Sequence, residues 1–469
     1  MIPGGPFMRW FEVGERACRS GARRRRVGEL VVLVALLPLA GAGLGQEGEA
    51  RFSNWSKVES PAAEETKKYK DSVKAGTFDA AARGFLEEVA LPQLSLEANR
   101  ATIERVRKRI REYLLADIDN DRAAEEASKT VLAFMNTLAA NDEAEPVVRV
   151  NAMLLIGELQ APKSKQPWPA ATAPLAEAVA NAALPRAVRI AACVGLARHV
   201  EAAKGIADEQ KRVAALALPA IAAVLAEPVP AGGGAENDWM AARCVAMLPV
   251  LGPLTPATAA DAVRLLGDGG RSINARVRAA AAVAAGAGPE AKLDKAAVIA
   301  AVAGLAVAAL EADVAAAERL ALDREYSGTA AGQGLPGGPL PAVSYDPASP
   351  PGSPLDPTLQ RPAAQWIPRE ACRRAAWRLA VLADAILSDD AKRGLATLGG
   401  DVVPEDKTLA QSLRRAALEL DAAPEEATLR QVLAELKPPE PATPEDEPDA
   451  ADAAVPAPAP PRAPPAGGR

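Results

Sequence analysis

The sequence predicts an all-α protein built from repeated helical hairpins. Hydrophobic residues make up 49% of the chain, whereas aromatic residues make up only 3%. Because alanine costs least in a helix interior, a core rich in alanine, leucine and valine favours helices that pack closely together. Runs of β-branched and aromatic residues with alternating polarity, which are typical of strands, are nearly absent. A segment that recurs along the chain is the third observation.

The recurring segment contains an arginine that follows an apolar residue and precedes small ones. PVVRVNAMLLIGEL is matched by LPRAVRIAACVGL, and Arg149 aligns with Arg189 forty residues later. Weaker copies place Arg243, Arg278 and Arg373 in the same role. Other apolar runs of helical character lie before or between these copies. The predicted unit is therefore helix, short turn, helix, with a period of roughly 35 to 50 residues.

At these residues the chain resembles the HEAT-repeat family, whose second helix commonly begins near a Val-Arg pair followed by small residues. The resemblance covers about residues 131–430, apart from two insertions. It implies a helical solenoid, in which each hairpin buries its apolar face only by stacking on its neighbours. The family commonly pairs the arginine with an acidic or similar residue shortly before it, and only three copies carry one, so we expect an incomplete ladder. The positions are Glu145, Asp238 and Asn274, with Pro185 and Arg369 in the other two copies.

Composition divides the chain into six predicted segments. Two of them are rich in proline, glycine and alanine, and such segments bury too little apolar area to offset their ordering entropy, so we expect them to be disordered. The segments are a leader at 1–45, an N-terminal helical cap at 46–130, HEAT-like repeats at 131–326, a disordered insertion at 327–367, a C-terminal helical repeat at 368–436 and a disordered tail at 437–469.

Within the cap, SLEANRATIERVRKRIREYLLADI carries apolar residues at helical spacing and charge on the other face. We expect this helix to cover the first hairpin, which otherwise leaves an apolar face exposed. Near the C-terminus, LAQSLRRAALELDAAPEEATLRQVLAEL predicts two short closing helices. The apolar positions of the cap helix are Leu96, Ile103, Val106, Ile110 and Leu114.

The leader has the three parts of a secretory signal peptide. A positive region at Arg23–Arg26 is followed by an apolar run from about Leu30 to Leu39, and then by small residues at 40–45. The alternative is an uncleaved membrane anchor, although the run is short for a span of roughly 20 residues and holds Glu29 near its start. We expect export, to the periplasm or out of the cell if the host is bacterial.

The charge of the chain argues against nucleic acid as a partner. The formal net charge is −6, and the one dense basic run belongs to the leader. Nucleic-acid binding normally needs a basic stripe, because neutralising the phosphates drives that association.

His199 is the one histidine of the chain, and it lies in a segment with reactive-looking neighbours. A single histidine rules out a His-rich metal cluster and the His-Glu pairs of HEAT-type iron hydroxylases. A Ser-His-acid site would need a nucleophile, and no serine flanked by glycines in the G-x-S-x-G pattern is present. On a helix, His199 shares the predicted buried face with residues such as Val188 and Leu196, and Arg189 and Cys193 lie on its flank. We expect a packing residue near a helix end, favoured there by the helix dipole. The rest of that face is Ala192 and Gly195.

Other reactive residues also favour structural interpretations. Cys18 belongs to the leader, and Cys193, Cys244 and Cys372 are too widely spaced for a disulfide framework or a CxxC metal site, so we expect buried core residues.

Three short motifs are also rejected as sites. Asp117, Asp119 and Asp121 resemble the start of a calcium loop, but Arg122 replaces the glycine of the turn and Ser128 the final glutamate. GDGGRS at 267–272 lacks the lysine of a phosphate loop and is interpreted as a turn. The sequon at Asn54-Trp55-Ser56 is interpreted as a chance occurrence.

The sequence therefore predicts an exported, non-enzymatic scaffold for protein–protein interaction. We expect no catalytic, cofactor-binding or metal-binding residue, no cofactor, and another protein, of a kind the sequence does not identify, as the partner. The alternative is a structural envelope component that the leader or the tail tethers to membrane or wall. An enzyme subunit with a ligand pocket is the third hypothesis.

Overall fold

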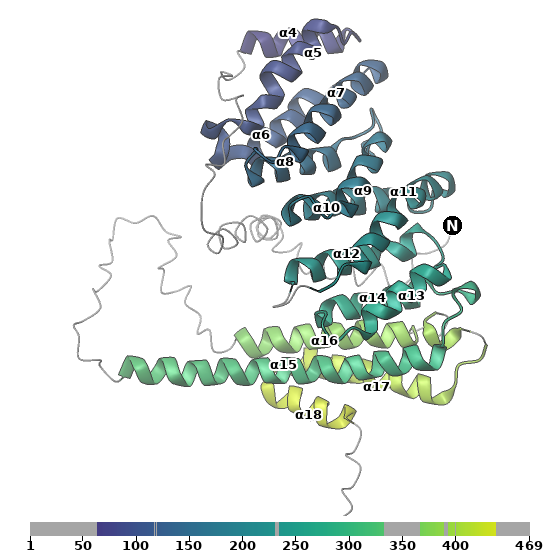
Figure 1. Ribbon diagram of the computed structural model, residues 1–469. Helices are drawn as coiled ribbons and strands as arrows, with labels where there is room; N and C mark the ends of the chain where they lie inside the picture. Colours follow the sequence, from purple (N-terminus) through teal and green to yellow (C-terminus); the bar gives the residue numbers. More distant parts are fainter. Residues whose placement is uncertain are drawn as a thin grey trace, which may run out of the picture.

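The fold is all-α throughout the described chain, which confirms the predicted fold class at that level. The structure is a computed structural model that describes residues 63–116, 118, 120–229, 234–332, 366–388, 393–398 and 400–437. Helices joined by short loops fill these ranges, and no β-strand is formed within them. The predicted leader, Cys18, the sequon at Asn54 and most of the insertion and tail lie outside the described residues. Figure 1 shows the helices stacked from α4 at one end to α18 at the other.

Five helical hairpins form the body of the molecule in two layers. The second helices of the hairpins, α8, α10, α12, α14 and α16, pack each against the next in one layer. The first helices α9, α11, α13 and α15 do the same in the other layer. The hairpins are α7 (Asp121–Ala140) with α8 (Pro146–Glu158), α9 (Thr172–Ala180) with α10 (Arg186–Ala203), α11 (Ala207–Ala226) with α12 (Ala235–Leu251), α13 (Pro256–Gly267) with α14 (Ile273–Gly286), and α15 (Lys295–Gly332) with α16 (Trp366–Ile386).

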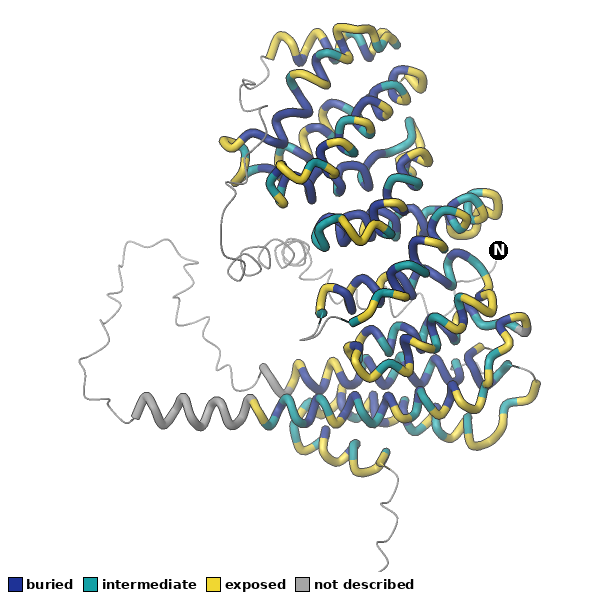
Figure 2. The backbone as a smooth tube through the Cα atoms, viewed as in Figure 1, coloured by how far each residue is buried: buried dark blue, intermediate teal, exposed yellow. Residues whose placement is uncertain are grey.

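Local sequence explains where several of these helices begin. Asn120 and Ser272 accept hydrogen bonds from backbone N–H groups in the first turns of α7 and α14. Thr255 and Thr258 form a reciprocal capping box at α13. Pro146 opens α8, where its missing N–H costs nothing because that group has no partner inside a helix. Alanine, leucine and valine make up most of the core between the layers, and Figure 2 shows buried residues along the facing sides of the helices.

The N-terminal cap is helical but not one continuous helix. The predicted amphipathic segment is divided into a 3-10 turn, an α-helix and a π-helical turn, and its apolar positions are buried except Val106, which is half-buried. The stacked rings of Tyr69 and Phe85 lie 5.0 Å apart, and the Tyr69 hydroxyl donates to the Leu114 carbonyl oxygen at 3.2 Å. The elements are α4 (Ala63–Lys74), α5 (Ala80–Gly84), η2 (Phe85–Ala90), η3 (Leu91–Ser95), η4 (Glu97–Thr102), α6 (Ile103–Arg109) and η5 (Ile110–Leu115).

Helices cross three of the predicted segment boundaries. The cap was expected to end at residue 130, but that position lies inside α7, which pairs with α8 as the first hairpin. The insertion was expected to start at residue 327 and end at 367, but α15 continues to Gly332 and α16 begins at Trp366. Alanine-rich sequence runs across these borders, so composition alone does not mark the helix ends.

The C-terminal end closes as a bundle of four helices. Helix α17 (Pro404–Ala422) packs against α16, and α18 (Glu426–Leu436) packs against α15 and α17, which confirms the two predicted closing helices. Residues Lys295–Arg319 of α15 are long and apolar enough to cross a membrane by length and composition alone. In the described fold this stretch packs against α16 and α18, and its Asp313 lies between Arg374 and Arg378 of α16.

Candidate functional site

His199 is a buried packing residue with a defined hydrogen bond. Its Nδ1 lies 3.0 Å from Thr172 Oγ1, and its side chain is 3% exposed. With the Thr172 hydroxyl donating to the Pro169 carbonyl oxygen at 2.9 Å, its oxygen accepts from the ring, which assigns the imidazole N–H to Nδ1. Nε2 is then a buried lone pair without a hydrogen-bond partner among the described residues. Burial lowers the pKa of His199 to about 4, and the positive charges of Arg198 and Arg212 add to the effect.

The neutral ring of His199 corrects the explanation by the helix dipole, and burial extends further around α10 than the sequence predicted. Dipole stabilisation at a helix end applies to a charged histidine, so it does not explain His199. Burial of the predicted face of α10 is confirmed, but Arg189 and Cys193, expected on the flank, are as deeply buried as the face itself. Helix α10 is enclosed by α8, α9, α11 and α12, which leaves it little outer surface.

An arginine, buried in two hairpins and half-buried in a third, ties the two helices of each of these hairpins together. It is the fourth residue of the second helix, and its Nε donates to a carbonyl oxygen in the last turn of the first helix, ten residues earlier. In α14 this residue is Arg276, so the sequence alignment on Arg278 is wrong by two positions. The bonds are Arg149 to Ala139 at 3.0 Å, Arg189 to Val179 at 3.0 Å and Arg276 to Leu266 at 2.8 Å.

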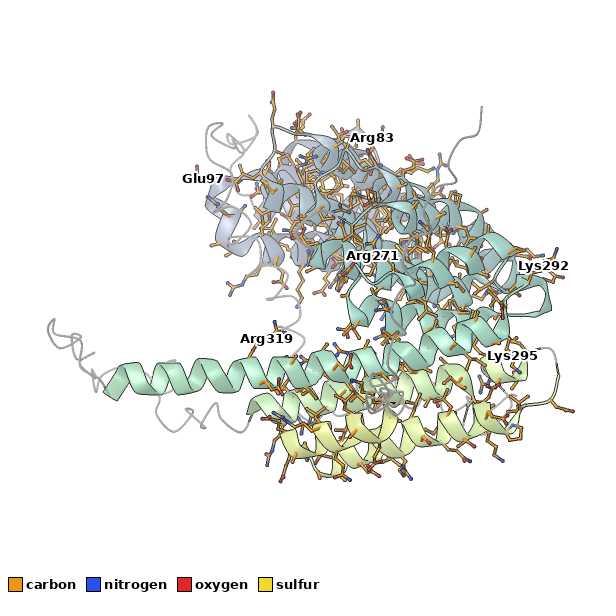
Figure 3. All side chains as sticks on the ribbon, turned by 60° about the horizontal axis from the view of Figure 1, so that its bottom comes forward. Arg83, Glu97, Arg271, Lys292, Lys295 and Arg319 are labelled. Atoms are coloured by element: carbon orange, nitrogen blue, oxygen red, sulfur yellow. The ribbon has the colours of Figure 1, made fainter. Side chains whose placement is uncertain are left out.

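In the third hairpin an acid replaces this arginine. Asp238 is the fourth residue of α12, and it accepts from Arg271 at 3.4 Å and from the Ser272 backbone N–H at 2.6 Å. Arg271, which is labelled in Figure 3, reaches back from the following hairpin, and its other amino group donates to the Glu227 carbonyl oxygen at 2.6 Å. The Glu227 carboxylate in turn accepts from Arg189. Polar contacts therefore link three consecutive hairpins.

The other acidic or amide residues of the expected ladder also bind arginines from other elements. Glu145 pairs with Arg100 at 3.6 Å, and Asn274 accepts from Arg378 at 3.0 Å. The expected pairing within each copy is thus replaced by pairing between copies. The sequence spacing could not show this, because the partners lie 33 or more residues away along the chain.

The arginines that were aligned incorrectly have other surroundings. Arg278 lies over the ring of Trp377, 4.9 Å from its centroid, and burial lowers its pKa. Arg373 and Arg243 are exposed. Arg243 lines a groove, which makes it the most informative of the three for function.

We call this groove the α10 groove. Its volume is about 510 Å³, and it opens along α8, α10 and α12 with one contribution from η5. Its floor includes small residues, and its rim carries three arginines and two glutamates. The lining residues are Arg111, Leu154, Gly157, Glu158, Val194, Gly195, Ala197, Arg198, Glu201, Ala202 and Arg243.

Two of the groove arginines are engaged within the fold and the third is free. Arg111 pairs with Glu158 at 3.2 Å, and Arg198 donates to the Gly157 carbonyl oxygen at 3.2 Å. Burial lowers the pKa of Arg198, and the charge of Arg111 adds to this effect while Glu158 opposes it. Arg243 makes no ion pair with any described residue and is exposed. Val194, 37% exposed, adds an apolar side chain beside it.

The three described cysteines are buried, as expected, but two of them touch. Cys193 Sγ on α10 lies 4.0 Å from Cys244 Sγ on α12. Cys372 donates to the Glu425 carbonyl oxygen at 3.4 Å. The sequence missed the contact because a separation of 51 residues says nothing of which helices become neighbours.

The rejected motifs have ordinary surroundings where they are described. Asp117 and Asp119 lie outside the described residues, and Asp121 is the first residue of α7 and pairs with Lys163. GDGGRS forms the turn between α13 and α14, in which Asp268 accepts from the Gly270 N–H. Across the described ranges, no group of three or more histidine, cysteine or acidic side chains is arranged to hold a metal ion.

Comparisons of the chain with family models, with curated proteins and with solved structures found no match. The helical stack is compatible with a solenoid, and the likeness to HEAT repeats rests on the recurring segment alone. Function must therefore be inferred from the geometry of the described residues.

Proposed function

We propose that this protein is an exported, non-enzymatic scaffold for protein–protein interaction, built on a HEAT-like solenoid, and that a protein partner docks in the α10 groove. The observation that carries the proposal is the groove itself, with an exposed valine beside an arginine that has no ion-pair partner in the described fold. Arginine can bind carboxylates and backbone carbonyls of a partner, and it is enriched in protein interfaces.

The polar groups inside the stack favour a structural role over a catalytic one. His199 is neutral and packed, Arg189 binds a carbonyl and a carboxylate, and Cys193 contacts Cys244. A catalytic group must reach a substrate, and these three side chains are at most 3% exposed. The residues available to a ligand are instead the charged and small side chains of an open groove, which suits a peptide segment or a protein surface.

Groove variants test the docking site. We would immobilise the wild-type chain and the variants Arg243→Glu and Val194→Asp, and measure what each retains from an extract of its own cell envelope. Lys211→Glu, an exposed charge reversal on the opposite layer, is the matched control. A partner that binds the wild type and the control, but neither groove variant, supports the proposal. Equal recovery by all four proteins would refute docking in this groove, provided that circular dichroism shows the same helix content.

Two further measurements test the rest of the proposal. Small-angle scattering of the purified chain should give a radius of gyration larger than that of a compact protein of this length, because stacked hairpins extend along one axis. Sequencing the N-terminus of the mature protein should give a start near Gln46. A start at Met1 or Met8 would favour the tethered component instead.

A further inference from the structure

Cys193 and Cys244 form a pair that the scaffold function does not use. They lie on α10 and α12, which are neighbours in the layer of second helices, and their Sγ atoms are 4.0 Å apart. Both side chains are fully buried. A disulfide bond is about 2.05 Å long, so the two sulfurs must approach by about 2 Å. Rotation about the Cα–Cβ bond of a cysteine moves its Sγ atom. The staggered positions of this bond are about 120° apart, and a rotation smaller than that moves Sγ far enough.

We propose that Cys193 and Cys244 form a disulfide that joins α10 to α12 when the chain folds in the presence of a thiol–disulfide oxidant. The thiolate of one cysteine attacks the oxidant R–S–S–R, which breaks its S–S bond, forms a mixed disulfide and releases one thiolate RS⁻. The second cysteine thiolate attacks the protein sulfur of the mixed disulfide and releases the second RS⁻. The two thiol protons end on the two RS⁻ groups, so the protein is oxidised by two electrons and R–S–S–R is reduced to two RSH.

Burial determines when this reaction takes place. In the folded chain the pair is buried away from oxidants, and the hydrogen bond with Cys193, together with burial, raises the pKa of Cys244, which disfavours the reactive thiolate. The link therefore forms while α12 is still closing on α10. Once formed, it is equally protected from reductants. The remaining described cysteine, Cys372, is bonded to the Glu425 carbonyl and stays a thiol.

Peptide mapping of the refolded full-length chain tests the pairing. The chain is unfolded under reducing conditions, refolded with either oxidised or reduced glutathione, alkylated and digested with trypsin. After refolding with the oxidised form, we expect the peptide Ile190–Arg198 linked to the peptide Cys244–Arg264, and Glu370–Arg373 alkylated. The reduced form should give these three peptides alkylated, together with the Cys18 peptide Ala17–Arg19. Native circular dichroism with Cys193 and Cys244 both alkylated after oxidative refolding would overturn the proposal.

Matched variants separate this link from incidental oxidation. Cys372→Ala should keep the linked peptide, whereas Cys193→Ala and Cys244→Ala should each lose it and leave the other thiol free. The native reduced wild type gives a second readout that needs no variant. Brief treatment with oxidised glutathione should leave it unlinked, because the pair is buried. A link that always includes Cys372, or one that forms as fast in the native protein as during refolding, would also contradict the proposal.

Discussion

A Cβ atom on Gly157 would lie 2.6 Å from the Cα atom of Gly195, so α8 and α10 meet backbone against backbone at this point. A Cβ atom on Gly195 would in turn meet the Leu175 side chain at 2.8 Å. Both glycines also line the α10 groove. The close approach of two helices therefore sets the depth of the groove as well as the spacing of the first two hairpins.

We expect Gly157→Ala to destabilise the protein by about 1–3 kcal/mol, the usual cost of forcing extra atoms into a packed interior. The cost of the clash must exceed the stabilisation of about 0.5–1 kcal/mol that alanine brings to a helix interior relative to glycine. Urea unfolding monitored by circular dichroism measures the difference. Gly304→Ala in α15 is the control, because no atom lies within 4 Å of its added Cβ, and it should stabilise. Equal stabilisation by both substitutions would contradict the close approach.

Arg189→Met should cost about 3–5 kcal/mol, because it leaves a half-buried carboxylate with one partner fewer and a carbonyl unbonded. Arg189 is 1% exposed, and it bonds both the Val179 carbonyl oxygen and Glu227. In the single variant Glu227 keeps its ion pair with Arg186. In a Glu227→Gln background no carboxylate is left to lose a partner, so the loss on Arg189→Met should be smaller. The exposed Arg243→Met is the control and should stay within about 0.5 kcal/mol of the wild type. A double-mutant cycle from urea unfolding that gives no coupling between Arg189 and Glu227 would rule out this account.

The repeated hairpin could be predicted because its signals are local. Apolar residues at helical spacing and the Val-Arg segment lie within single helices, so the second helices at Arg149 and Arg189 were found with their neighbours. The alignment failed at α14, where Arg276 and Arg278 both follow the helix start and only their carbonyl contacts distinguish them. It failed at α12 because Asp238 takes the place of the arginine.

The groove and the cysteine pair could not be predicted, because both depend on how separate hairpins stack. Arg243 looked like a repeat residue in the sequence, and only the packing of α8, α10 and α12 makes it part of a groove. Cys193 and Cys244 occupy different positions in their helices, so no regular spacing brings them together. Long-range contacts of this kind follow from inter-helix distances that the Gly157–Gly195 contact helps to set.

Asp313→Asn should destabilise the C-terminal bundle by about 3–5 kcal/mol. The carboxylate is 2% exposed and accepts from Arg374 at 2.9 Å and from Arg378 at 2.6 Å. Without its charge, the buried Arg378 keeps only a neutral acceptor on α14 and a neutral amide in α15. Asp261→Asn breaks an exposed pair with Arg264 and should change the free energy of unfolding by less than about 1 kcal/mol. If Asp313→Asn and Asp261→Asn changed thermal unfolding equally, α15 would not be held in the bundle by the ion pairs of Asp313 with α16.

The stability of the protein should fall between pH 6.5 and pH 4 in a way that depends on His199. The pKa of His199 is lowered from 6.5 to about 4 on folding. As the pH falls below about 6.5 the unfolded chain takes up a proton that the folded chain does not, so the free energy of unfolding decreases until the folded pKa is reached. The full loss is about 3.5 kcal/mol, at about 1.4 kcal/mol for each unit of pKa.

His199→Gln isolates this contribution, because an amide can still bond Thr172 but does not titrate in this range. The pKa values of Glu209 and Glu227 are also lowered, by hydrogen bonds from arginine in both cases and against the effect of burial. These groups also lose their stabilising effect as the pH falls, so the pH dependence of the wild type alone does not isolate the contribution of His199. Urea unfolding at several pH values gives the free energy of unfolding as a function of pH. Above pH 4 this free energy should change less steeply with pH in the variant than in the wild type. Parallel slopes would show that the imidazole is free to take up a proton in the folded chain, and that Thr172 does not hold it in a dry, neutral site.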